Sequence, residues 1–118
     1  MNADGMEILR KYKDDVAALA VAKVHIEHLV KSPINENQRA ALESFVLCQG
    51  SGALQSSNLI KFVNYIEDYS EEAVFAAADE FYNPIYAQKN GKLNKKLEDR
   101  REMESKLFLK PVIVGGKK

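Results

Sequence analysis

The 118-residue sequence lacks several features that mark specialised classes of protein. Its one cysteine, Cys48, excludes an internal disulfide and a cysteine-rich metal site. Its 17 lysine and arginine residues balance 17 aspartate and glutamate residues, so no global field attracts nucleic acid or an acidic membrane. A neutral chain also lacks the repulsion that opposes self-association, which favours a homo-oligomer.

No apolar run is long enough to cross a membrane. The apolar stretch that begins at Val16 is soon interrupted by Lys23 and His25, whereas a spanning helix needs about 20 mostly apolar residues. The first residues, Met1 to Glu7, have neither the basic region nor the apolar run of a secretory signal. We therefore expect a cytoplasmic protein that does not bind membranes.

The sequence does contain strong helical periodicity. A content of 46% hydrophobic and 29% charged residues is typical of a globular domain, and the chain is long enough to bury a core. The segment from Met6 to Val30 has no glycine or proline, and its middle is apolar nearly all the way round. Because such a helix needs neighbours on every side, we expect it at the centre of the fold.

Further helices are predicted after Pro33. Asn35 and Gln38 have the spacing of a capping box, and Ser57 or Asn58 can cap a later helix. Pro84 is expected to kink a helix that continues to Asn90-Gly91. The predicted helices after the first are Glu36 to Cys48, one from residue 58 to a turn at 68–70, one from 70 to 90, and the charged segment Lys92 to Phe108.

The predicted fold class is therefore all-α. We expect a compact bundle of four or five helices, formed by residues 1–108, around the long N-terminal helix. Residues 109–118 should form an extended tail, in which Val112, Ile113 and Val114 are the only strand-like run.

No group of residues has the spacing of a catalytic or metal site. His25 and His28 are three residues apart and lack the further ligands that zinc needs, and Cys48 lies on an apolar helix face, which favours a buried thiol. Adjacent carboxylates such as Asp79 and Glu80 point to different sides of a helix. The sequence thus predicts a protein that is not an enzyme and holds no cofactor or metal.

The leading hypothesis is a small intracellular interaction module. It would bind and block or bridge a protein partner, as an inhibitor, immunity-type or adaptor protein, and would self-associate. The narrow apolar stripe of the last helix and the unpaired tail favour this, because both could pack against a partner. The residues assigned to the interaction surface are Tyr82, Tyr86, Leu97, Arg100, Arg101, Met103, Val112, Ile113 and Val114.

The alternative hypothesis is a nucleic-acid-binding regulator. Four lysines, Lys89, Lys92, Lys95 and Lys96, gather at the predicted start of the last helix. The helix dipole does not stabilise positive charge at a helix N-terminus, so folding does not explain this cluster. Phosphate contacts would explain it, and binding would then fall steeply with salt.

Overall fold

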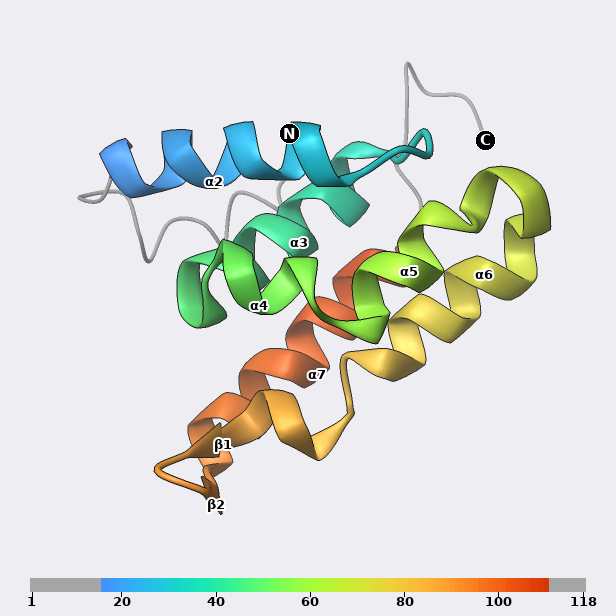
Figure 1. Ribbon diagram of the computed structural model, residues 1–118. Helices are drawn as coiled ribbons and strands as arrows, with labels where there is room; N and C mark the ends of the chain where they lie inside the picture. The colour runs from blue at the N-terminus through green and yellow to red at the C-terminus, as the bar shows by residue number, and fades with distance from the viewer. Residues whose placement is uncertain (1–15, 111–118) are drawn as a thin grey trace.

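The computed structural model describes residues 16–110 and is mostly helical. The all-α class predicted from the sequence is confirmed. Within the described residues six α-helices, one 3-10 helix and a two-stranded hairpin follow in the order α2 (Val16–Leu29), α3 (Glu36–Gln49), α4 (Ser51–Gln55), α5 (Asn58–Asn64), α6 (Ile66–Glu80), η2 (Pro84–Ala87), β1 (Gln88–Lys89), β2 (Lys92–Leu93) and α7 (Lys95–Leu109) (Figure 1). None of these helices is long and apolar enough to cross a bilayer.

Helix α3 lies at the centre of the described fold. It packs on α2 at one side and on α7 at the other, and α6 covers α7 in turn (Figure 1). Phe45 of α3 meets the rings of Phe81 and Tyr86 edge-on, at centroid distances of 6.1 and 5.1 Å. The buried residues of α3 are Asn37, Gln38, Ala40, Ala41, Leu42, Glu43, Ser44, Phe45 and Val46.

The N-terminal helix occupies a different place from the one expected. Residues 6–15 of the predicted helix lie outside the described range, and α2 forms an outer layer across α3 and α4 (Figure 1). Among the side chains described in α2, only Ala22 and Ile26 are buried. The long helix is therefore not the centre of the described core, because its described part packs on α3 and α4 and leaves most of its side chains exposed.

The predicted helix caps are confirmed. Asn35 Oδ1 accepts a hydrogen bond from the Gln38 amide at 2.7 Å, and Gln38 Oε1 accepts one from the Asn35 amide at 2.9 Å. Ser57 Oγ accepts from the Ile60 amide at 3.2 Å and so caps α5. Each cap satisfies amides that the first helical turn leaves without a partner.

Pro84 stops a helix instead of kinking it, so this expectation was wrong. Helix α6 ends at Glu80, and Pro84 begins the short helix η2, because proline lacks the amide that a continuing helix requires. Asn90 and Gly91, expected as a helix end, have φ values of 56° and 80° and form the two-residue turn between β1 and β2. Such a turn matches the twist of a hairpin.

The remaining boundaries also differ from the predicted ones. Lys92 belongs to β2, and α7 begins only after Asn94, whose side chain accepts from the Leu97 amide at 3.1 Å. The break between α5 and α6 falls at Tyr65 and not at residues 68–70. The glycine- and serine-rich segment after Gln49 contains the short helix α4. The predicted strand-like run, Val112 to Val114, lies outside the described residues.

Candidate functional site

A cluster of charged side chains is buried between α3 and α7. Glu104 is 0% exposed and Arg101 is 1% exposed, although both residue types usually lie at the surface. Ser44 Oγ of α3 donates a hydrogen bond to Glu104 Oε2. The cluster therefore joins the central helix to the last helix through polar groups that water does not reach.

Two consecutive arginines neutralise Glu104. Arg101 Nη2 donates to Glu104 Oε2 at 3.0 Å, and its Nε lies 2.9 Å from Oε1. Arg100 Nε lies 3.3 Å from Glu104 Oε2, while its Nη2 donates to the Ser44 carbonyl at 2.9 Å. Removing the arginines from such a buried carboxylate would cost free energy, because no other interaction would offset the loss of its hydration.

The helical period explains why these charges point inward. Leu97, Arg101, Glu104 and Phe108 are spaced by four, three and four residues, which places them on one face of α7. The guanidinium carbon of Arg101 lies 5.0 Å from the centre of the Phe45 ring, close enough for a cation–π contact. The inward face of α7 therefore carries an ion pair between two apolar residues.

Burial shifts the protonation of Glu104. The loss of water raises the pKa of its carboxyl to about 7, although Arg101, Ser44 and Arg100 act in the opposite direction. A raised carboxyl pKa is typical of a group that can act as a general acid near neutral pH. Here the carboxyl is 0% exposed and is enclosed by Ser44, Arg100 and Arg101, so it holds α3 and α7 together.

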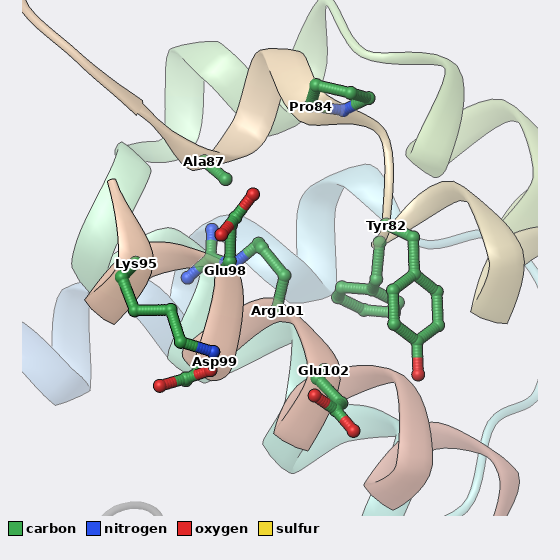
Figure 2. A pocket seen from close by; sticks show the side chains of 9 residues that line it. Tyr82, Pro84, Ala87, Lys95, Glu98, Asp99, Arg101 and Glu102 are labelled. Carbon is green, nitrogen blue, oxygen red and sulfur yellow. Dashed lines mark hydrogen bonds and ion pairs between the residues drawn. The ribbon is translucent and has the colours of Figure 1, made fainter. Parts of the chain in front are cut away.

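An open pocket of about 280 Å³ lies on the outer side of Arg101, between α7 and the segment around η2. Figure 2 shows its carboxylates along α7, with Tyr82 beside them and the η2 residues above. The residues that line it are Phe81, Tyr82, Pro84, Ala87, Lys95, Glu98, Asp99, Arg101 and Glu102.

The pocket combines carboxylates with an exposed aromatic ring. Tyr82 is 51% exposed. Asp99 pairs with Lys95 at 2.9 Å, and Glu102 pairs with Lys106 at 2.9 Å. Glu98 lies one helical turn before Glu102. An aromatic face next to hydrogen-bonding groups is suited to a sugar, whose C–H face packs on the ring while its hydroxyls bond to the carboxylates.

A second pocket, of about 300 Å³, lies beside Tyr86. The Tyr86 hydroxyl donates to Glu80 Oε2 at 2.8 Å, and its backbone carbonyl accepts from Gln49 Nε2 at 2.7 Å. Burial, followed by the neighbouring Glu80, raises the pKa of Tyr86 to about 12, so the phenol remains a donor at neutral pH. Tyr86 is only 8% exposed and is not the exposed anchor expected from the sequence.

The residues predicted to form one interaction surface differ in exposure, and some of them are buried. Tyr82 and Met103 are exposed, and Leu97 is half-buried, but Arg101 is in the interior and Arg100 is held by Glu104. Arg101 therefore cannot contribute to an exposed binding face. Val112, Ile113 and Val114 lie outside the described residues.

The lysine cluster, Cys48 and the two histidines lie at or near the surface. Lys89, Lys92, Lys95 and Lys96 are exposed on the hairpin and at the start of α7, and Lys95 is engaged by Asp99. Cys48 is partly exposed, so the buried thiol expected from the sequence is not found. His25 is half-buried and His28 is exposed.

Sequence reasoning missed Glu104, although a signal for it exists. Only the leucines and the methionine of α7 were considered for its inward face, and its charged residues were treated as exposed to solvent. The stripe that runs from Leu97 to Phe108 includes Arg101 and Glu104. Two opposite charges therefore lie on the helix face that is expected to point inward. A paired charge on such a stripe indicates a buried ion pair.

Comparison with known proteins relates this chain to lysozymes. The sequence profile described as phage lysozyme matches residues 2–104. Among solved structures, the chain resembles the muramidase domain of SpmX from Asticaccaulis excentricus, with 31% sequence identity and a TM-score of 0.67. The match covers 80% of this chain and 61% of that one, so the chain spans less than two thirds of the muramidase domain it resembles. No curated protein matches significantly.

These matches overturn the functional expectations drawn from the sequence. A blocking or bridging interaction module, the nucleic-acid-binding alternative and the absence of enzymatic function are all contradicted by the lysozyme match. Because the match extends over residues 2–104, this chain belongs to the phage lysozyme family.

Proposed function

We propose that this chain takes part in the hydrolysis of peptidoglycan glycan strands as a lysozyme-like muramidase. The observation that carries the proposal is the match to the phage lysozyme family over residues 2–104. The resemblance of the helical fold to a muramidase domain supports it independently.

The chemistry of glycoside hydrolysis sets a geometric requirement. An acid protonates the leaving oxygen while a second carboxylate acts from the other side of the bond, so the two groups must face one another across the sugar. In the pocket of Figure 2, Glu98, Asp99 and Glu102 all come from α7. The opposite wall, formed by Phe81, Tyr82, Pro84 and Ala87, carries no carboxylate.

The α7 pocket is therefore assigned to glycan binding and not to bond cleavage. Tyr82 would pack against a sugar ring, and Glu98 with Glu102 would accept hydrogen bonds from its hydroxyls. In this proposal the residues of α7 position the glycan strand, and the acid and its opposing carboxylate lie outside this pocket.

Co-sedimentation of the full chain with purified peptidoglycan sacculi tests the glycan-binding role. The chain should pellet with sacculi, and Tyr82→Ala should weaken binding by about threefold to tenfold, because a stacked aromatic contact is lost. The double substitution Glu98→Gln and Glu102→Gln should also weaken binding. The matched control removes two exposed charges from α6, with Glu71→Gln and Glu72→Gln, and should bind as the unmodified chain does.

Cleavage is measured as new reducing ends released from sacculi, with muropeptides identified by mass spectrometry. The reaction contains the full chain together with a polypeptide that supplies the part of the SpmX muramidase domain not covered here. Cleavage that requires this chain supports the proposal. A chain that does not pellet with sacculi, or that adds nothing to cleavage when it does, contradicts it.

A further inference from the structure

One guanidinium nitrogen of Arg101 is left without a partner. The side chain is 1% exposed, and its Nε and Nη2 lie 2.9 and 3.0 Å from the two oxygens of Glu104. Because Nε and Nη2 share one edge of the planar guanidinium, Nη1 points away from that carboxylate. Nη1 is buried and has no hydrogen-bond partner in the part of the chain that the structure describes. A buried donor in this state costs free energy, so we expect a group that accepts from it.

Arg101 is also a wall of the α7 pocket, which lies on its outer side (Figure 2). Glu98, another residue of this wall, precedes Arg101 by three positions, so the two side chains share a face of α7. Asp99 and Glu102 are held by lysines, whereas no described residue holds the exposed Glu98 carboxylate. The pocket therefore offers one donor and one acceptor that are both free to bind a ligand.

The charges of the pocket restrict which group can satisfy Nη1. Glu104 already neutralises Arg101, and Glu98, Asp99 and Glu102 line the same pocket. A phosphate or a carboxylate would therefore be repelled. An ammonium group would be attracted by the carboxylates, but it has no lone pair with which to accept a hydrogen bond. The group that fits is neutral and carries both an acceptor and a donor.

A secondary amide with a small apolar end meets these requirements. Its carbonyl oxygen accepts, its N–H donates, and its methyl group can pack on an apolar surface. The wall that faces α7 provides such a surface, through Phe81, Pro84 and Ala87. In the glycan strands of peptidoglycan this group is the acetamido substituent at carbon 2 of each sugar.

We infer that the α7 pocket recognises the acetamido group of a 2-acetamido sugar, and that Arg101 determines this specificity. Arg101 Nη1 donates to the acetamido carbonyl, Glu98 accepts from its N–H, and the methyl group packs on the opposite wall. A carboxylate can accept several hydrogen bonds, so Glu98 can bind a sugar hydroxyl as well. The inference rests on the glycan-binding role proposed for this pocket and names the chemical group that the pocket selects.

Titration calorimetry of the full chain with three β-1,4-linked tetrasaccharides tests the selectivity. Tetra-N-acetylchitotetraose carries an acetamido group at carbon 2, cellotetraose carries a hydroxyl, and chitotetraose carries an amine. The acetylated form should bind about tenfold more tightly than cellotetraose, because it alone satisfies the buried donor. It should also bind more tightly than chitotetraose. Equal or tighter binding of either unacetylated form overturns the inference.

Two variants on the exposed side of α7 separate amide recognition from general sugar binding. Glu98→Ala should reduce the preference for the acetylated tetrasaccharide over cellotetraose to about threefold or less, because the amide N–H loses its acceptor. Glu102→Ala is the matched control. It should weaken both tetrasaccharides by a similar factor and leave the preference unchanged. A preference that Glu98→Ala does not alter contradicts the assignment of Glu98.

Arg101 also holds Glu104 in the core, so its role is measured in the unmodified chain. The side-chain nitrogen signals of arginine are followed by NMR while tetra-N-acetylchitotetraose is added. The Arg101 signal should shift, and cellotetraose should shift it less. Arg100 is the internal control, because Ser44 and Glu104 hold it and it does not line the pocket. An Arg101 signal that the acetylated sugar leaves unchanged overturns the inference.

Co-sedimentation with sacculi, measured on the same preparations, distinguishes this inference from the proposed function. A chain that pellets with sacculi but binds the three tetrasaccharides equally, or binds none of them, retains its glycan-binding role and overturns the acetamido assignment. A chain that neither pellets with sacculi nor binds the acetylated tetrasaccharide overturns both proposals.

Discussion

Helices α2 and α3 are each 14 residues long, but the more apolar of the two is the less buried. Helix α3 contains charged and amide residues, yet nine of its residues are buried. Helix α2 is far more apolar, yet among its described side chains only Ala22 and Ile26 are buried. Apolar content alone therefore does not decide which of two adjacent helices becomes the core.

Partners from distant parts of the chain explain the difference. Asn37 Nδ2 donates to the Lys110 carbonyl at 3.0 Å, Lys23 lies 3.1 Å from the Glu43 carboxylate, and Ser44 donates to Glu104. A buried polar group is tolerated when its hydrogen bonds are satisfied. Helix α3 can be buried with its polar residues because several of them have partners, whereas within residues 16–110 part of the apolar surface of α2 is left exposed.

The largest contrast between the two helices should appear when each loses an apolar side chain. Phe45→Ala should lower the free energy of unfolding by about 3–5 kcal/mol, because it leaves a cavity against Phe81, Tyr86 and Arg101. Val24→Ala should change it by only about 0.5 kcal/mol or less. Urea unfolding followed by circular dichroism measures both, and comparable losses would contradict the assignment of α3 as the central helix.

The polar contact between α3 and α7 should give the protein a dependence on pH. The pKa of Glu104 is raised from 4.5 to about 7, so the folded state binds this proton more tightly than the unfolded state. The resulting stabilisation is complete below pH 4.5 and is lost as the pH rises to about 7, by up to roughly 3 kcal/mol.

Glu104→Gln isolates this contribution, because the amide does not titrate. The difference in unfolding free energy between the two proteins should change between pH 4.5 and 7 and become constant above that range. Denaturant titrations at several pH values measure it. A constant difference throughout would show that Glu104 does not titrate in this window.

A smaller loss of stability is expected when the ion pair between α2 and α3 is broken. Lys23→Met leaves the Glu43 carboxylate, which is 0% exposed, without its cation. Loss of a partner from a buried group costs about 1–3 kcal/mol, and the half-exposed Lys23 side chain places this case at the lower end. The matched control is Lys61→Met, which removes an exposed lysine from α5 and should leave stability unchanged.

The smallest effect should come from placing a charge on the open side of α2. Val24→Asp should alter the free energy of unfolding of the chain alone by no more than about 0.5 kcal/mol, since its site is exposed. If it unfolds the chain alone, the exposed face of α2 already has a partner.

Features determined by nearby residues were predictable from the sequence. The capping box at Asn35, the cap at Ser57 and the presence of most helices depend on groups within about four residues, so local spacing predicts them. The same reasoning failed at Pro84, where two structures were possible. A kinked helix and a stop followed by a hairpin share the same local pattern, and the contacts of η2 with α7 favoured the second.

The candidate site was predictable only in part. Tyr82 was recognised as an exposed aromatic residue, but the ring became part of a pocket only when α7 packed beside η2. Arg101 was assigned to the interaction surface of the last helix, whereas its inward position depends on Phe45 and Glu104. The family was not recognised from the sequence and was identified only by comparison with known proteins.

The sequence by itself determined that this protein is helical and where several of its helices begin, because caps and helical periodicity act over a single turn. The tertiary structure decided which helix is central, which charges are buried and where the pocket between α7 and η2 lies. The physical reason is that burial depends on partners far apart in the chain, such as Ser44 with Glu104 and Asn37 with Lys110. No local pattern specifies such partners before the helices meet.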